Sequence, residues 1–184
     1  MKCTFAFLVD DTIHNYVRKK SIEINKIIKK GFLGSLLPPH ISLKQPFAID
    51  DIESVEKYFD CLSSEIKPMK LKIGPTYLWE NVIGLNVQET NELRECHNKI
   101  NKELKSICKN STALYDGSKY HFHLTIALSG KDKDEYKRAY EILKDDQILF
   151  ECEINKIVMF YYDDDNYQIG TFITYKVNEL KNDA

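Results

Sequence analysis

The chain has 184 residues, of which 43% are hydrophobic, and its formal net charge is −2. This length and apolar content predict one folded domain, residues 1–184, and exclude a disordered chain. Because Lys+Arg and Asp+Glu nearly cancel, the protein has no global basic field, and we expect no binding of long duplex nucleic acid. No apolar run approaches the length of a transmembrane helix, so no membrane association is expected.

The five cysteines are odd in number, widely spaced and without a C-x-x-C pair. Such a set is typical of free thiols in a reducing compartment rather than of a disulfide framework. We therefore expect a cytoplasmic protein. The apolar segment 3–9 stops at Asp10 and lacks a small-residue cleavage site, so it is interpreted as a strand and not as a signal peptide.

The first half of the chain predicts five elements from its hydrophobic spacing. Two segments have apolar residues at helical spacing, and three others have the composition of strands. In chain order these are a strand at 3–9, a helix at 12–30 that glycines 31 and 34 end, a strand starting at His40, a helix at 51–66 and a strand at 71–79.

The second half repeats this order. It contains a strand at 82–87, a helix that Thr90 caps and that runs to about residue 109, a polar loop, a strand at His123, a helix at 132–143, a strand at 149–162, a turn at 163–166 and a hairpin strand at 168–177. An internal duplication explains the repeated order. It predicts two pseudo-symmetric lobes whose histidine strands meet at the axis between them.

Two short strings at matching places of this repeat carry the functional signal. Residues 39–43 read PHISL and residues 122–126 read FHLTI. Each has a histidine and a hydroxyl residue two positions apart, which in a strand places both on one face, about 6–7 Å apart. Either string alone is weak evidence, because such short patterns recur freely in structural strands. The pair, both in strands and at matching places, indicates a site with two histidines and two hydroxyls.

Such a site suits acid–base chemistry at a phosphate. One neutral imidazole, from His40 or His123, can take a proton from an attacking hydroxyl while the other, as imidazolium, protonates the leaving oxygen. Ser42 and Thr125 can donate hydrogen bonds to the non-bridging phosphate oxygens. This arrangement requires neither a metal nor a cofactor. The natural reaction is the opening of a cyclic phosphodiester or its reverse, and the sequence leaves open which histidine is the acid.

The two strings resemble the paired H-x-[S/T]-x motifs of the 2H phosphoesterase superfamily, in particular its bacterial 2'-5' RNA ligase and RNA cyclic phosphodiesterase branch. The segment 157–167 is also similar to the final hairpin of that family. The resemblance covers nearly the whole chain. It implies a bilobal α+β fold with an antiparallel sheet in each lobe facing a central cleft and helices on the outside. It also implies metal-independent action on 2',3'-cyclic phosphates or 2'-5' linkages.

The motifs depart from the family pattern at two positions. Phe122 precedes the second histidine where many relatives have proline, and Leu128 stands where relatives often carry a basic residue. The first motif has Lys44 at the place equivalent to Leu128. Lys44 should point into the same cleft as Ser42, where it either meets phosphate or is a solvated lysine.

Several aromatic residues are candidates for stacking on a base, but each can also be explained as part of the core. Phe7 is the first choice for a base-stacking residue because its strand resembles the opening strand of the family. The aromatic residues Trp79, Tyr161 and Tyr162 are the other stacking candidates, although most aromatics in such strands belong to the core. Residues 163–165 read as a turn rather than a calcium loop.

The other histidines are weaker candidates. His121 shares a face with His123 by alternation and is its rival for the catalytic role, whereas His14 and His97 are expected to have surface or core roles. A zinc site would draw on Cys96, His97, Cys108, His121 and His123, but their spacing fits no standard ligand pattern.

The leading hypothesis is an enzyme that acts as a monomer on RNA ends or small nucleotides bearing a cyclic phosphate or a 2'-5' linkage. The alternative is a module that binds a nucleotide or phosphorylated metabolite without turning it over. A purely structural scaffold is a third possibility, and it predicts no cleft with converging histidines.

Overall fold

The computed structural model describes residues 1–28, 37–128, 132–146, 148–162 and 172–181. Within these ranges the chain forms eight strands and four helices, and all strand pairs are antiparallel. The elements are β1 (Lys2–Leu8), α1 (Asp11–Asn25), β2 (His40–Ala48), α2 (Ile52–Glu65), β3 (Met69–Trp79), β4 (Val82–Val87), α3 (Asn91–Ile107), β5 (His123–Leu128), α4 (Lys133–Leu143), β6 (Phe150–Ile154), β7 (Lys156–Tyr162) and β8 (Ile173–Glu179). The expected α+β class is confirmed.

All four predicted helices form, and each begins at a side-chain cap. Asp10, Asp51, Thr90 and Asp132 accept hydrogen bonds from backbone N–H groups of the first turn that have no partner within the helix. Helix α1 ends at Asn25, earlier than predicted, because the chain tightens there into a turn with Ile27 N donating to Ile24 O at 2.9 Å. Glycines 31 and 34 lie outside the described residues.

The strands form one continuous sheet in the order β6-β3-β4-β5-β2-β1-β7-β8. This corrects the expectation of a separate sheet in each lobe. Two four-stranded halves are joined where β2 pairs with β5, and Ile41 opposite Leu124 is the register pair of that junction. The two histidine strands are therefore neighbours at the centre of the sheet, although the internal duplication itself stays a prediction.

The predicted strand at 149–162 is two strands, β6 and β7, which separate at Asn155. β6 pairs with β3 at one edge of the sheet, whereas β7 pairs with β1 in the other half. The alternation of exposed and buried residues in β6 ends at this break, where the exposed residues Asn155 and Lys156 adjoin and a continuous buried run begins. The predicted turn at 163–166 lies outside the described residues, and the following strand is described from Ile173 to Glu179.

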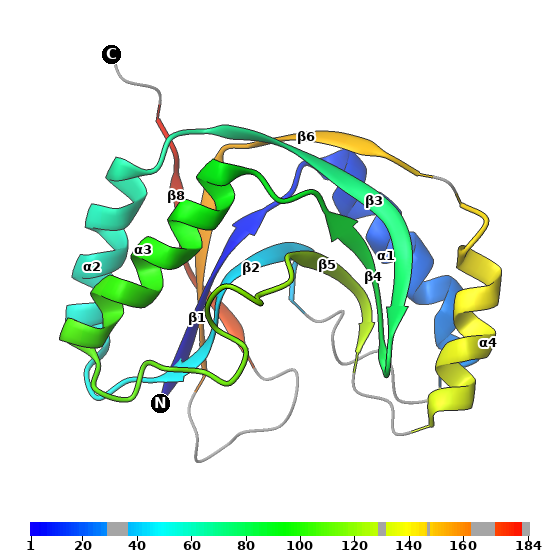
Figure 1. Ribbon diagram of the computed structural model, residues 1–184, viewed down its shortest axis with the longest axis horizontal. Helices are drawn as coiled ribbons and strands as arrows, with labels where there is room; N and C mark the ends of the chain where they lie inside the picture. The colour runs from blue at the N-terminus through cyan, green and yellow to red at the C-terminus, as the bar shows by residue number, and fades with distance from the viewer. Residues whose placement is uncertain (29–36, 129–131, 147, 163–171, 182–184) are drawn as a thin grey trace.

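The helices cover the two halves of the sheet in pairs. Helices α2 and α3 pack on β8 and β2 at one end, and α1 and α4 pack on β5, β3 and β4 at the other (Figure 1). Most of the buried apolar side chains form one cluster that runs through both halves. Among the described helices, none has the length and apolar character needed to cross a membrane.

Candidate active site

The two histidine strings lie side by side because β2 and β5 are neighbours. Ile41 and Leu124 face each other and are fully buried, so the residues on either side of them point to the opposite face. The antiparallel register then places His40 opposite Thr125 and Ser42 opposite His123. Residues that face each other in this way have Cβ atoms about 4.5–5.5 Å apart. The four predicted residues therefore form a compact square in which each histidine faces the hydroxyl of the other string.

Both imidazoles are held by the same kind of contact. His40 Nδ1 lies 2.8 Å from Pro38 O, and His123 Nδ1 lies 2.9 Å from His121 O, in each case the carbonyl two residues earlier. A carbonyl oxygen only accepts hydrogen bonds, so Nδ1 must carry the proton in both rings. The Nε2 atom of each neutral imidazole is consequently left with a lone pair. This is the form that can accept a proton from a nucleophile.

The surroundings keep both imidazoles neutral. Burial lowers the pKa of His40 to about 4, with further lowering by the positive charges that His123 and Arg18 can carry, while the bond to Pro38 O acts in the opposite direction. Burial also lowers the pKa of His123, helped by His121 and opposed by the bond to His121 O. In the free protein the surroundings thus favour the neutral form of both imidazoles. A bound phosphate would raise both pKa values by favouring the imidazolium form.

Each histidine packs against an aromatic ring that the sequence did not single out for this role. The Phe160 ring meets His40 edge-on at 4.9 Å, and the Tyr77 ring meets His123 edge-on at 6.1 Å. Tyr77 reaches β5 because Gly84 lies between them on β4, and a Cβ at that glycine would come within 3.0 Å of Tyr77 Cε1. The glycine therefore leaves room for the tyrosine ring beside the site.

Lys44 does not point into the cleft with Ser42. The pairing of β1 with β2 shifts register at this point, so that two consecutive residues, Leu43 and Lys44, are fully buried. This bulge interrupts the alternation on which the prediction relied. Lys44 Nζ forms a buried ion pair with Asp116, from the loop that precedes β5. The ion pair connects β2 to that loop and leaves Lys44 without the exposure that a phosphate contact needs.

Phe7 is also placed away from the square. It lies opposite Ile41 in the β1–β2 pairing and is fully buried in the main apolar cluster. The face of β1 that adjoins the histidines presents Ala6 and Leu8 instead, which lie opposite Ser42 and His40. Phe7 therefore packs in the core and offers no stacking surface, because alternation along β1 turns it to the other side.

The two remaining candidate histidines, His97 and His121, lie in different environments. His97 is fully buried, its Nδ1 donates to Leu43 O at 2.7 Å and its Nε2 accepts from Gly117 N at 3.1 Å, which is the expected core role. His121 is exposed, hydrogen-bonds Asn86 Oδ1 at 3.0 Å and stacks beside His123 at 6.1 Å. His121 is thus a neighbour of the square rather than part of it. Among the described residues, no group of three or more His, Cys, Asp or Glu could hold a metal ion.

Sequence comparisons place this geometry in a known family. Residues 29–166 match the model of the 2'-5' RNA ligase superfamily, and the chain belongs to that superfamily, as the resemblance of its motifs to 2H phosphoesterases indicated. A protein named "Putative phosphoesterase" from Bacillus licheniformis is 33% identical over 117 residues, which cover 60% of this chain and 63% of that relative. A protein of the same name from Geobacillus sp. strain WCH70 is 31% identical over 136 residues, 69% of this chain and 72% of the relative.

Solved structures show the same fold. The protein TT0787 of Thermus thermophilus superposes with a TM-score of 0.65 at 11% identity, over 98% of both chains. Escherichia coli LigT in complex with 3'-AMP gives a TM-score of 0.57 at 14% identity, also over 98% of both chains. At these identities the likeness establishes the architecture, in which the square of His40, Ser42, His123 and Thr125 lies at the centre.

Proposed function

We propose that this protein is a phosphoesterase that opens a cyclic phosphodiester, such as the 2',3'-cyclic phosphate of RNA or of a nucleotide, or acts on a 2'-5' linkage. The main support for this proposal is that the same kind of hydrogen bond, from Nδ1 to a backbone carbonyl, holds each of the two histidines. His40 and His123 lie on one face of adjacent strands, and each is fixed through Nδ1, while its Nε2 has no partner among the described residues. Membership of the 2'-5' RNA ligase superfamily supports the same chemistry.

In the proposed reaction, one neutral imidazole removes a proton from water, and the water oxygen forms a bond to phosphorus. The bond from phosphorus to one ribose oxygen breaks, and the other histidine, protonated once the phosphate is bound, gives its proton to that oxygen. Ser42 and Thr125 donate hydrogen bonds to the non-bridging oxygens. If the 5'-hydroxyl of a second RNA replaces water, the same steps join two RNA ends, so hydrolysis and ligation share one site. The mechanism uses no metal or cofactor.

We infer different roles for the two histidines from their surroundings. His40 has the strongly lowered pKa, and Arg18 adds to that lowering, so His40 is the better candidate for the unprotonated base. His123 is then the acid. An aryl phosphodiester with a p-nitrophenolate leaving group tests this assignment, because such a leaving group departs without a proton. On that substrate His123→Asn should retain far more activity than His40→Asn, and the reverse result would exchange the two roles.

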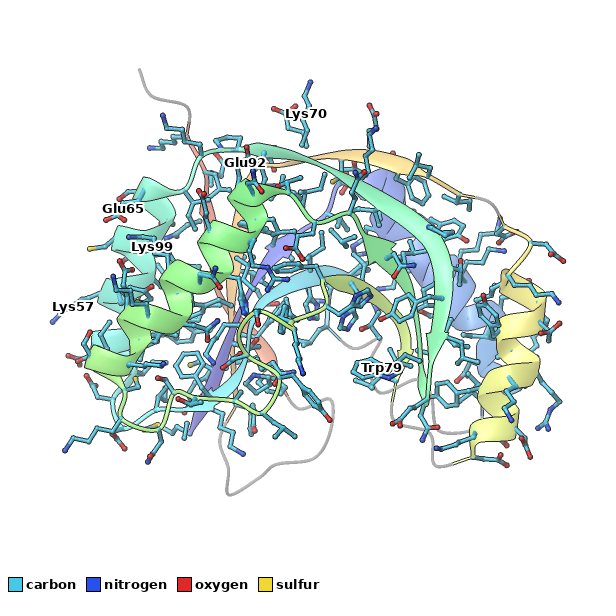
Figure 2. All side chains as sticks on the ribbon, in the orientation of Figure 1. Lys57, Glu65, Lys70, Trp79, Glu92 and Lys99 are labelled. Atoms are coloured by element: carbon cyan, nitrogen blue, oxygen red, sulfur yellow. The ribbon has the colours of Figure 1, made fainter. Side chains whose placement is uncertain are left out.

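An exposed aromatic pair supports a nucleotide as the substrate. Trp79 lies two residues beyond Tyr77 on β3, and its ring meets that of Tyr115 edge-on at 6.2 Å. Trp79 is 49% exposed and Tyr115 is 55% exposed, which is unusual for large aromatic side chains and leaves their faces free to stack on a base. Trp79 lies on the inner side of the arch between the two helix pairs (Figure 2).

The proposed setting is the cytoplasm, with the protein acting as a monomer on RNA ends or small nucleotides. The structure contains five free cysteines, four of them buried, which supports a reducing compartment.

A substrate panel tests the function. Nucleoside 2',3'-cyclic phosphates, short RNAs ending in a cyclic phosphate and 2'-5' dinucleotides would be incubated with the wild-type protein, with chelator present and absent, beside the double variant His40→Asn/His123→Asn. We expect turnover of at least one class, insensitivity to chelator and loss of turnover in the double variant. Tight binding of these ligands without turnover of any of them would instead favour the nucleotide-binding module.

A further inference from the structure

A small pocket opens next to one corner of the square. Its lining includes His40 and Thr125 together with Arg18 and Ser21 from α1 and Leu37 from the segment before β2. Arg18 is the one residue with a permanent charge among those that line it, as far as the structure describes the chain. The pocket therefore joins a guanidinium to a predicted catalytic histidine and to the hydroxyl of the other string.

Two backbone contacts hold Arg18 in this position. Ser21, one helical turn further along α1, donates from Oγ to Ile126 O at 2.7 Å and so fixes the helix against β5. Arg18 Nη2 donates to Leu37 O at 2.6 Å. The next carbonyl along the chain, Pro38 O, holds His40, so consecutive carbonyl groups of one segment fix the guanidinium and the imidazole relative to each other.

Arg18 has no counterion among the residues that the structure describes. Among the described residues it makes this one hydrogen bond and no ion pair, although a guanidinium has five N–H donors. Burial lowers the pKa of Arg18, and within the described part of the chain no carboxylate opposes that lowering. Lys44, by contrast, is already paired with Asp116. A half-buried guanidinium that lies beside a histidine and a hydroxyl, with no counterion from the described residues, is a site that an anion would complete.

We propose that Arg18 is the phosphate-binding cation of this protein and that its guanidinium, together with the Thr125 hydroxyl, holds the non-bridging oxygens of the phosphate at which the histidines act. This assignment rests on the proposed function for the identity of the anion. Because Arg18 lies at the His40 corner, it would also fix the distance between the phosphate and His40. The sequence motifs contain no sign of this residue, since it comes from a helix outside both strings.

The test compares Arg18→Gln with Lys19→Gln, which removes the same charge from the adjacent, exposed position of α1. Binding of inorganic phosphate and of a nucleoside 3'-monophosphate would be measured by calorimetry, and turnover by the panel above. Loss of one charge-assisted hydrogen-bonding partner should weaken phosphate binding and lower kcat/KM roughly 10- to 100-fold in Arg18→Gln. Lys19→Gln should change neither by more than about twofold, since an exposed charge is screened.

The variant Arg18→Lys is a second test, because it keeps the positive charge and changes only the geometry of the hydrogen-bond donors. It should fold like the wild type, which thermal unfolding would verify, and bind phosphate roughly 3- to 10-fold more weakly because the two-pronged geometry is lost. Wild-type phosphate affinity in both Arg18 variants would overturn the proposal. So would equal losses in Arg18→Gln and Lys19→Gln, because they would indicate a long-range charge effect.

The outcomes separate this inference from the proposed function. If the wild type binds phosphate through Arg18 but turns over no substrate, the enzyme proposal fails and the anion site stands. If the wild type is active and Arg18→Gln is equally active, the assignment of Arg18 fails alone. Arg18→Gln could also lose affinity for dinucleotides alone and bind inorganic phosphate normally. That result would indicate that Arg18 contacts a neighbouring phosphate, and it would contradict a contact with the reacting phosphate.

Discussion

The two histidines of the site make the same hydrogen bond to the backbone but have different surroundings. His40 and His123 are each held by the carbonyl two residues earlier, which reflects the likeness of their strings. The His40 side adds a guanidinium from α1 and the ring of Phe160. The His123 side adds Tyr77 and the exposed His121, with Trp79 two residues beyond Tyr77 on β3. The paired strings therefore specify the proposed reacting groups, and under the proposed function the unlike neighbours would suit one side to phosphate and the other to a base.

The largest expected effect comes from removing either histidine. His40→Asn and His123→Asn should each lower kcat/KM on the natural substrate roughly 100- to 10,000-fold, the usual contribution of a positioned general acid or base. Steady-state kinetics on the most active member of the substrate panel would measure this. Asparagine keeps a polar group of similar reach, and circular dichroism would verify the fold. If either variant kept full activity, the histidine that it lacks would not take part in the reaction, and only the other histidine would be catalytic.

Lys44→Met distinguishes a structural lysine from a phosphate-binding one. The change leaves Asp116 as a buried carboxylate without its partner, and breaking a buried ion pair costs about 3–5 kcal/mol of unfolding free energy. Denaturant unfolding would measure the loss. The double variant Lys44→Met/Asp116→Leu should recover part of it, because no unpaired charge remains. If Lys44→Met instead kept its stability and lost phosphate affinity, Lys44 would belong to the site after all.

Gly84→Ala should disturb the His123 side alone. Its Cβ would lie 2.8 Å from Leu124 O and 3.0 Å from Tyr77 Cε1, and the first of these is backbone that cannot move aside cheaply. We expect a loss of about 1–3 kcal/mol in unfolding free energy, as for other overpacked positions. In NMR spectra the His123 ring signals should shift, while those of His40 should not. Equal shifts in both rings would show that the two sides are mechanically coupled.

The last expected effect is a shift in the titration of His40. In the free protein its pKa of about 4 means that NMR should show a neutral imidazole down to acidic pH. Because the unfolded chain binds this proton near the ordinary pKa of about 6.5, the free energy of unfolding should fall as the pH decreases from there toward 4. Adding inorganic phosphate should raise the pKa of His40 in the wild type, and less so in Arg18→Gln. A His40 that titrates normally without ligand would contradict the burial on which its role as base depends.

Much of the site could be read from local pattern. A strand turns alternate side chains to the same face whatever its neighbours are, so the pairing of His40 with Ser42 and of His123 with Thr125 followed from spacing alone. The same period failed at Lys44 and between β6 and β7. At Lys44 the outcome depends on how β2 pairs with β1, which the residues of β2 do not encode, whereas the break before β7 coincides with the adjacent polar residues Asn155 and Lys156.

The sequence by itself thus determined the helices, the class of fold and which four side chains share a face within the two strings, because these depend on the periodicity and chemistry of contiguous residues. The tertiary structure alone decided which strands are adjacent, that the two strings form one square, and that Arg18 and Tyr77 join it. These contacts unite residues that are distant along the chain, and their geometry depends on strand order, register and the packing of α1 on β5. Such relations exist only once the whole chain has folded.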